Sequence, residues 1–497
     1  MTDLARPALP LRHAPGGNAA RPEGVGPSRF VAARALQMLI VGVGCGPVLR
    51  FLVEVPLLSP IHVGVLGATG AVGAHLVRLL AGHPWFELTE VGASGDSEGA
   101  SLARRLRELG GGDVSEAAGD LELRDLDDEW EAPLLLSALP SDVAGKLEAK
   151  LAVRGHLVVS NASAHRMGKD IPLVVPEVNP DHLALLDGLG EGAGGVVTNP
   201  NCVAAGLAVV LGPLHQALGL KSVIVTTFQA ASGAGRGSPW SGRLMGNVLP
   251  YIPGEEEKIG PELRKILGTL KDHTVEPAAF DVSVTSTRVP VEHGHLASVS
   301  LAFDNKAGSA EVIAALREFQ SAVLEDGLPL APVAPVVVFD EDDRPQPALD
   351  RDLGGGMTVS VGRVRPCEVL HVKLMVLSHN LVRGAAGAAL LNAELCAVRG
   401  RVPGVEAAAV RGAGLAPEIG GDAASDAGDE TPAGEAEAGA AEGVAGAVAE
   451  AVADERHAEE MVVPAAFVDT TDDRAEEDDD APEMVSGFEP PGPWGQV

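Results

Sequence analysis

Cys202 follows the segment Thr198-Asn199-Pro200-Asn201, where a short apolar run gives way to a polar turn and then to a helix-like apolar stretch. A thiol at the start of a helix lies near the positive end of the helix dipole and near unpaired backbone N–H groups, and both favour the thiolate. An isolated cysteine is more often a small buried hydrophobic residue. Cys202 is therefore a candidate nucleophile that needs a base, a cofactor site and a substrate pocket.

The segment from Arg288 to His295 offers a base and a group that binds carboxylates. It reads Arg-Val-Pro-Val-Glu-His-Gly-His, so an arginine and a histidine flank an irregular turn around a proline and a glycine. Arg288 can hold a carboxylate through two parallel hydrogen bonds, and His295 can act as a general base. From the residues alone, His293 is as good a candidate for the base as His295.

Three further polar side chains carry weaker signals. Gln229 ends an apolar strand and precedes the small-residue loop 230–235, which would let a flat cofactor ring approach the backbone. Functional and surface roles are equally open for this glutamine. Glu255 and Lys258 stand three residues apart and share one face of a helix, although a solvated charged turn also explains this pattern.

A glycine-rich turn predicts a dinucleotide site. The β-branched run Ile61–Leu66 is followed by Gly67, Gly70 and Gly73 in the spacing G-x-x-G-x-x-G, and then by a helical apolar pattern. Gly67 permits the tight turn, Gly70 lets the backbone approach a pyrophosphate at the helix N-terminus, and Gly73 allows close helix packing.

The end of the next strand, Leu88–Val91, favours NADP over NAD. Where an NAD enzyme would place an acidic residue for the ribose, this chain has Ser94, with Ser97 and two arginines further on. Hydroxyl groups without a carboxylate can accept a 2′-phosphate. Asp96 and Glu98 lie nearby and oppose this interpretation.

The hydrophobic periodicity predicts a Rossmann-type domain followed by an α+β domain with a mixed sheet. Buried parallel strands are expected at 134–140 and 157–161. Longer alternating strands are expected at 222–228, 281–285, 297–303 and 368–376, with helices at 310–325 and 385–398.

Composition bounds the partners and the compartment. The chain has 497 residues and a formal net charge of −32, of which residues 401–497 carry −20 through 24 acidic and 4 basic residues. Such acidity argues against nucleic acids and anionic membranes as partners. The tail buries too little apolar surface to offset its chain entropy, so we expect it to be disordered, as a solubilising extension or an interaction segment.

The four cysteines and the N-terminal region complete this picture. The apolar stretch 36–58 is interrupted by glycines, a proline, Arg50 and Glu54, so it is a poor membrane span, and it starts too far into the chain for a signal peptide. Cys45, Cys202 and the other two cysteines are too scattered for a metal site or a disulfide framework. We expect a reducing, cytoplasmic compartment and no bound metal.

Nine motifs in order resemble the aspartate-semialdehyde dehydrogenases of the branch typical of archaea and fungi. They run from about Val63 to Ala397 and read GATGAVG (67–73), SNASAHRM (160–167), PLVVPEVNPDH (172–182), TNPNC (198–202), FQAASGAG (228–235), NVLPYIPGEEEK (247–258), RVPVEHGH (288–295), DRPQPALDRD (343–352) and SHNLVRGAAG (378–387).

The resemblance implies the NADPH-dependent reductive dephosphorylation of aspartyl phosphate to aspartate semialdehyde, with release of phosphate, in the biosynthesis of lysine, threonine and methionine. Cys202 would form the thioester, and His295 rather than His293 would be the acid/base. Gln229 would orient the substrate. The other substrate-binding residues carried over are Asn201, Arg288, Glu255, Lys258 and Arg166. The cofactor-binding residues carried over are Gly67, Thr69, Gly70, Ala71, Val72, Gly73, Ser94, Ser97, Ser232, Gly233 and Asn380.

The resemblance also implies a domain organisation and an oligomer. We expect a dispensable N-terminal extension (1–60), an NADP-binding domain (61–200), a catalytic and dimerisation domain (201–370), a returning C-terminal helix (371–400) and the acidic tail (401–497). The second domain of the family carries the subunit interface, so a homodimer or homotetramer is expected.

Two departures and two rival interpretations stand beside this one. Val203 replaces the serine or threonine that usually follows the nucleophile, and a lysine common near the cofactor serines is absent at Ala100 and Ser101. A malonyl-CoA reductase of the same fold would also keep the cysteine and the histidine. A non-catalytic paralogue is the rival from another functional class, although Cys202, Gln229 and His295 are all present.

Overall fold

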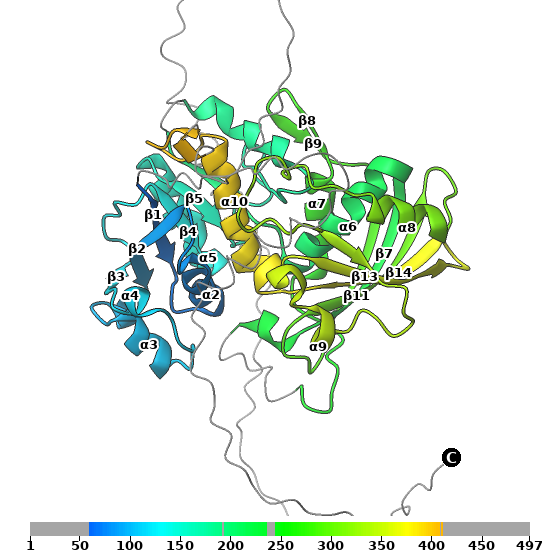
Figure 1. Ribbon diagram of the computed structural model, residues 1–497, viewed down its shortest axis with the longest axis horizontal. Helices are drawn as coiled ribbons and strands as arrows, with labels where there is room; N and C mark the ends of the chain where they lie inside the picture. Colours follow the sequence, from blue (N-terminus) through cyan, green and yellow to red (C-terminus); the bar gives the residue numbers. More distant parts are fainter. Residues whose placement is uncertain (1–58, 191–192, 236–243, 408, 411–497) are drawn as a thin grey trace, which may run out of the picture. The chain divides into compact units, whose positions relative to one another are not determined.

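The computed structural model describes residues 59–190, 193–235, 244–407 and 409–410. The predictions for residues 1–58 and 411–497 lie outside these residues. Within the described part, no helix is long and apolar enough to cross a membrane. Figure 1 shows two large sheets with helices packed around them.

A six-stranded parallel sheet forms the first domain and confirms the predicted Rossmann-type architecture. Its strand order is β3-β2-β1-β4-β5-β6, the doubly wound order of dinucleotide-binding folds. The strands are β1 (Ile61–Leu66), β2 (Phe86–Ala93), β3 (Leu123–Asp125), β4 (Leu134–Ser137), β5 (Leu157–Ser160) and β6 (Gly195–Thr198). The helices between them are α2 (Ala71–Leu80), α3 (Leu102–Glu108), α4 (Glu116–Gly119) and α5 (Ser141–Val153), with a 3-10 helix η1 (Gly95–Ser97) after β2 and another, η2 (Pro180–Leu189), before β6.

A six-stranded mixed sheet forms the second domain, in the order β10-β7-β11-β14-β13-β12. Its strands are β7 (Leu220–Gln229), β10 (Asp281–Arg288), β11 (His295–Phe303), β12 (Val336–Val338), β13 (Val359–Pro366) and β14 (Val372–Ser378). The other elements are α6 (Cys202–Leu218), η3 (Ala231–Ala234), α7 (Glu256–Ile266), the hairpin β8 (Thr269–Lys271) and β9 (Thr274–Glu276), α8 (Ser309–Arg317), α9 (Pro347–Asp350) and η5 (Leu353–Gly356).

Two predicted boundaries in this domain are wrong, and one strand was not predicted. Residues 368–371 form the turn between β13 and β14 rather than part of a strand, and β13 itself escaped prediction. The helix expected at 310–325 ends at Arg317. It ends there because Val312 and Leu316 pack in the core of the mixed sheet while Val323 packs in the core of the parallel sheet. The chain must therefore cross between the two cores after the helix.

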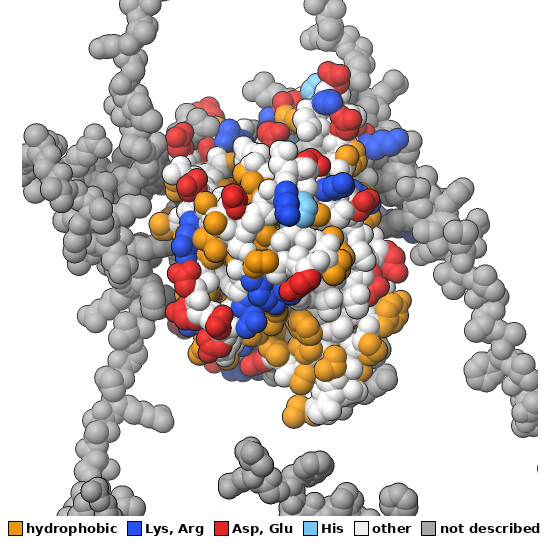
Figure 2. Space-filling view, turned by 90° about the vertical axis from the view of Figure 1, so that its right-hand side faces the viewer, with side chains coloured by type: hydrophobic (Ala, Val, Ile, Leu, Met, Phe, Trp, Pro, Cys, Tyr) orange, Lys and Arg blue, Asp and Glu red, His pale blue; other side chains and the backbone are white. Residues whose placement is uncertain are grey.

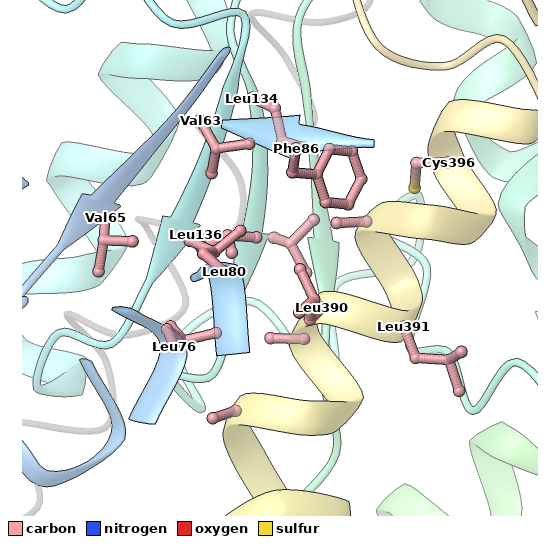
Figure 3. Close-up of a cluster of buried hydrophobic side chains, with 14 of the residues drawn as sticks. Val63, Val65, Leu76, Leu80, Phe86, Leu134, Leu136, Leu390, Leu391 and Cys396 are labelled. Carbon is pink, nitrogen blue, oxygen red and sulfur yellow. The ribbon is translucent and has the colours of Figure 1, made fainter. Parts of the chain in front are cut away.

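The C-terminal helix returns to the parallel sheet. A π-helical turn, η6 (Val382–Ala386), leads into α10 (Gly387–Val398), which is buried along its whole length. Leu390 and Cys396 of α10 belong to the same buried cluster as Val63, Leu136 and Phe86 of the sheet (Figure 3). This packing explains why α10 is nearly all apolar, although it lies far from the first domain in sequence.

Two expected domain limits shift as a result. Strand β14 continues the mixed sheet to Ser378, so the second domain extends past residue 370. The folded chain also continues beyond 400, because Val402 and Val410 are buried in the core of the parallel sheet. The part of the acidic tail that the structure describes is therefore packed rather than disordered.

Candidate active site

The turn before Cys202 is held by a chain of buried asparagines. Strand β6 ends at Thr198, and the Asn199 side chain donates to Asn161 Oδ1 at 2.9 Å and accepts from Asn392 Nδ2 at 2.6 Å. Asn201 then caps α6, because its Oδ1 accepts hydrogen bonds from the backbone N–H groups of Val203 (2.8 Å) and Ala204 (3.3 Å). The cap needs no hydroxyl at position 203, so Val203 leaves the helix start intact.

Cys202 and His295 face each other, with 3.3 Å between Sγ and Nε2. His295 begins β11, 93 residues away in sequence. The backbone N–H of Ala230 donates to His295 Nδ1 at 3.0 Å, so Nδ1 carries no proton. The neutral ring therefore presents its N–H, at Nε2, to the sulfur. This geometry makes the neutral ring a hydrogen-bond donor to the sulfur.

The surroundings set the protonation of both groups. Burial, then Arg288 and His379, lower the pKa of His295 to about 3, so the ring is neutral at physiological pH. Burial and then the Glu255 carboxylate raise the pKa of the Cys202 thiol to about 12, against the opposing effects of Arg166, Arg288 and the Val203 backbone. The backbone at the helix start therefore does lower the pKa of the thiol, but burial and Glu255 outweigh this effect in the protein without its substrates.

Arg288 and Gln229 are direct neighbours. They pair across the parallel strands β10 and β7 at the ends of those strands, and both are buried. Arg288 Nη1 donates to the carbonyl of Ala230 at 2.9 Å, so the Ala230 peptide contacts both Arg288 and His295. A Cβ on Gly233 would lie 2.7 Å from Arg288 Nη1 and 3.0 Å from His295 Cε1, so only glycine allows η3 this close an approach.

Glu255 contacts residues of the site, whereas among the described residues the Lys258 side chain does not. One oxygen of Glu255 accepts from Asn201 Nδ2 at 2.9 Å and from Gln229 Nε2 at 3.1 Å. Lys258 is exposed, and within the described parts of the chain it makes no hydrogen bond to these residues. Four of the predicted substrate-site side chains therefore lie together: Asn201, Gln229, Glu255 and Arg288.

Arg166 lies near the same region and is held there by residues that were not predicted from the sequence. Its Nη1 donates to Glu262 at 3.0 Å, and its charge acts on the Cys202 thiol. Glu262 and Lys265 are buried on α7, at helical spacing from Glu255 and Lys258. That spacing was the available signal, because positions seven residues apart lie on one face of a helix.

The glycine turn has the geometry that a pyrophosphate requires. Gly67 has φ +77°, and a Cβ on Gly73 would lie 2.1 Å from the Gly67 carbonyl oxygen. Gly70 is the N-cap of α2 and makes no side-chain cap, so the first N–H groups of the helix, from Ala71 onward, remain for a ligand. Thr69 and Val72 flank this point in the sequence. These residues fit a dinucleotide.

Ser97 and Ser94 differ in their surroundings. Ser94 is exposed, whereas Ser97 is buried and accepts a hydrogen bond from Arg105 Nε at 2.9 Å. Arg105 therefore places a cation beside the predicted ribose site, although it also pairs with Glu108 at 3.2 Å. A cation and two hydroxyls at this strand end suit a 2′-phosphate.

The remaining cofactor residues form a separate cluster with His293. Ser232 Oγ accepts from Asn380 Nδ2 at 2.9 Å and lies 2.9 Å from His293 Nδ1. Asn380 Oδ1 in turn accepts from the backbone N–H of Gly294 at 2.9 Å. His293 thus contacts the predicted cofactor loop, whereas His295 contacts the thiol. This difference distinguishes the two histidines, which were equally good candidates for the base from the residues alone. Among the described residues, no group of three potential metal ligands lies together.

Two family models match the chain in the same order as its domains. Residues 62–186 match the semialdehyde dehydrogenase NAD binding domain, and residues 211–383 match the semialdehyde dehydrogenase dimerisation domain.

Several named relatives share most of their length with this chain. The aspartate-semialdehyde dehydrogenase of Archaeoglobus fulgidus is 44% identical over 337 residues, which cover 67% of this chain and 97% of that protein. The enzyme of the same name from Aspergillus fumigatus is 43% identical, covering 68% and 98%. The malonyl CoA reductase (NADP) of Metallosphaera sedula is 33% identical, covering 68% and 97%.

Among solved structures, the aspartate semialdehyde dehydrogenase from Candida albicans with NADP matches with a TM-score of 0.63 at 37% identity. The match covers 68% of this chain and 98% of that one.

Proposed function

Because the chain belongs to the aspartate-semialdehyde dehydrogenase family, we propose that it catalyses the NADPH-dependent reductive dephosphorylation of L-aspartyl-4-phosphate to L-aspartate 4-semialdehyde. The observation that carries the proposal is the 3.3 Å approach of Cys202 Sγ to His295 Nε2 beside the buried Arg288–Gln229 pair. A nucleophile, a hydrogen-bond donor and a carboxylate clamp that lie together are the parts that acyl transfer from a small amino-acid phosphate needs.

In the first half-reaction the Cys202 sulfur bonds to the acyl carbon and the C–O bond to phosphate breaks. The thiol proton leaves with the phosphate, which accounts for a site in which the free thiol has a pKa of about 12. Arg166 and Lys258 are the cations proposed to contact that phosphate. Arg288 holds the α-carboxylate, and Glu255, assisted by Gln229 and Asn201, faces the amino group.

In the second half-reaction the α2 turn and the Ser232–Asn380 cluster would hold NADPH, which would supply the hydride that reduces the thioester. His295 Nε2–H donates a hydrogen bond to the substrate oxygen or to the sulfur as it leaves, and a proton from the solvent then restores the thiol. The neutral ring suits this donor role.

The reverse reaction tests the proposal. Purified protein should reduce NADP in the presence of L-aspartate 4-semialdehyde and inorganic phosphate, more efficiently than it reduces NAD. Cys202→Ala should abolish turnover and retain NADP binding, whereas Cys367→Ala, a partly exposed cysteine of the β13–β14 turn, should stay active. Turnover of malonyl-CoA alone would instead support the thioester reductase.

The open face of the mixed sheet supports a homodimer. Ile224, Thr226 and Phe228 of β7 point away from the covering helices, and Ser298 and Met375 pair beside Thr226. Ile224 is 45% exposed although it lies mid-strand. This sheet lies within the matched dimerisation domain. Figure 2 shows further exposed hydrophobic side chains on one face of the molecule. Light scattering should give a dimer, with a tetramer as the other outcome, and Ile224→Glu should give a monomer.

We also place the protein in a reducing, cytoplasmic compartment, because its nucleophile must remain a free thiol and the three described cysteines are unpaired. The family matches begin at residue 62 and end at 383, so we propose that residues 1–58 and 411–497 are dispensable for turnover.

A further inference from the structure

We propose that Glu262 is a positioning residue that fixes Arg166, and through it the phosphate subsite, relative to the nucleophile. This inference rests on the proposed function, because it assigns Arg166 to the substrate phosphate. Glu262 itself is buried, 2% exposed. It acts through the groups that it holds.

Each carboxylate oxygen of Glu262 accepts a hydrogen bond from a different part of the site. Oε1 accepts from Arg166 Nη1 at 3.0 Å, and Oε2 accepts from the backbone N–H of Asn201 at 2.5 Å. Asn201 directly precedes Cys202 and caps its helix. A single rigid carboxylate therefore spans the phosphate-binding guanidinium and the backbone that aims the thiol, and charge-assisted hydrogen bonds of this kind are the strong ones.

Lys265, one turn further along α7, holds the loop that carries Arg166. Its ammonium donates to the carbonyls of Arg166 (2.7 Å), Gly168 (2.6 Å) and Ile171 (2.8 Å). Burial lowers the pKa of Lys265 to about 8, so the group keeps all three donors at neutral pH. Helix α7 thus fixes both the backbone and the side chain of Arg166.

The guanidinium held in this way keeps a donor for a ligand. Arg166 Nη2 donates to the Asn161 carbonyl at 2.7 Å, while Nε is buried and has no hydrogen-bond partner among the described residues. A buried donor without an acceptor is costly, and an anion at this position would remove the cost. Glu262 therefore leaves a prepared donor for phosphate instead of neutralising Arg166 completely.

Steady-state kinetics of the reverse reaction test the assignment. Glu262→Gln keeps the shape of the side chain and weakens its charge-assisted bonds, so the KM for phosphate should rise about 10-fold while the KM for NADP stays within about 2-fold. Glu257→Gln, an exposed residue of the same helix, is the matched control and should behave as wild type. Lys265→Met should repeat the selective loss if Glu262→Gln fails to fold.

A double-mutant cycle separates positioning from general damage. If Glu262 acts through Arg166, the variant Arg166→Met/Glu262→Gln should have the same KM for phosphate as Arg166→Met. Additive losses, an unchanged KM for phosphate, or parallel rises for phosphate, aldehyde and NADP would overturn the proposal.

A binding assay distinguishes this failure from failure of the proposed activity. Inorganic phosphate should slow the alkylation of Cys202 by iodoacetamide in the wild type, and should do so about 10-fold less effectively in Glu262→Gln. If the wild type shows no turnover but keeps this difference, the activity is wrong and the positioning role stands. The positioning role is overturned if phosphate protects Cys202 equally in the two proteins, or if it does not protect Cys202 in the wild type.

Discussion

At the scale of single residues, the site depends on how groups distant in sequence set each other's protonation. The thiol of Cys202 is protonated because burial and Glu255 together outweigh two arginines and a helix N-terminus. His295 is neutral because it is buried beside Arg288, and its tautomer follows from one backbone N–H. The free protein therefore holds a thiol–imidazole pair rather than an ion pair, which leaves activation of the sulfur to the bound substrate.

Removal of the Glu255 charge should make the free thiol more reactive. Glu255→Gln removes a like charge that raises the pKa of Cys202, so the thiolate fraction at pH 8 should increase, and iodoacetamide should alkylate Cys202 about 10-fold faster. Glu257→Gln lies two residues away in the solvent and serves as the control. Mass spectrometry of the Cys202 peptide over time gives both rates. Equal rates for the two variants would show that Glu255 does not control the thiol.

At the scale of elements, two glycine-containing turns bring backbone segments together that side chains would keep apart. In the glycine turn, Gly73 lets α2 start against the carbonyl of Gly67. In the π-helical turn η6, Gly384 packs on the first residue of α6: a Cβ there would lie 2.7 Å from the Cβ of Cys202. π-Helical turns inside helices are frequent at functional sites, and this one directly supports the nucleophile.

In the glycine turn we expect Gly73 to be needed for packing and Gly70 to be needed for ligand binding. Gly73→Ala should lower the melting temperature by several degrees and weaken NADP binding, because overpacking at 2.1 Å costs about 1–3 kcal/mol. Gly70→Ala meets its nearest atom at 3.4 Å, so it should keep the melting temperature and lose only NADP affinity. Thermal denaturation and fluorescence titration with NADP measure the two effects. A loss of stability in both variants, or in neither, would contradict these roles.

The second turn should control the position of the thiol. Gly384→Ala should reduce kcat by about 100-fold, because a displacement of the nucleophile by about 1 Å disrupts its alignment with the acyl carbon. Binding of NADP should not change. Gly188→Ala, where a Cβ would meet nothing within 4 Å, is the matched control for steady-state kinetics. A Gly384→Ala enzyme with the wild-type kcat would mean that the backbone relaxes without moving Cys202.

At the scale of the whole molecule, one chain builds two large sheets and uses its last helix to cover the first. A buried ion pair supports that return: Arg383 of η6 bonds both oxygens of Glu177 and also donates to the Met357 carbonyl at 2.9 Å. Helix α10 then packs on the parallel sheet. The proposed catalytic residue Cys202 lies beside Gly384 of η6, so the integrity of the site and the stability of the fold depend on neighbouring contacts.

Buried neutral histidines should make the protein sensitive to acid. Burial lowers the pKa of His379 to about 4, against the opposing charge of Asp352, and that of His295 to about 3. The unfolded chain binds these protons near pH 6.5, so the free energy of unfolding should fall as the pH drops from about 6.5 to 4.

Substitution of His379 tests this linkage. His379→Asn keeps an acceptor near the N–H groups of Leu381 and Val382 and removes one titration, so its melting temperature should depend less steeply on pH across the window. His273→Asn, at an exposed turn with φ +62°, is the control. Identical slopes for His379→Asn and wild type would exclude His379 as a source of acid sensitivity.

The sequence by itself determined the features that short segments encode. The strand–glycine–helix pattern at Gly67–Gly73, the helix start at Cys202 and the α/β architecture follow from local periodicity and turn chemistry, which neighbouring residues decide. The resemblance of the motifs pointed to His295 and Arg288 as the proposed acid/base residue and the proposed carboxylate clamp.

Only the tertiary structure decided how these parts act on one another. The protonation of Cys202, the tautomer of His295, the contacts of Glu262 and Lys265 and the contact of Gly384 with Cys202 depend on burial and on groups that lie between 36 and 182 residues apart. Strand β13 and the end of α8 escaped prediction for the same reason, because they are set by which core a side chain enters. Local sequence specifies an element, whereas its electrostatics and its limits are set by the elements that pack against it.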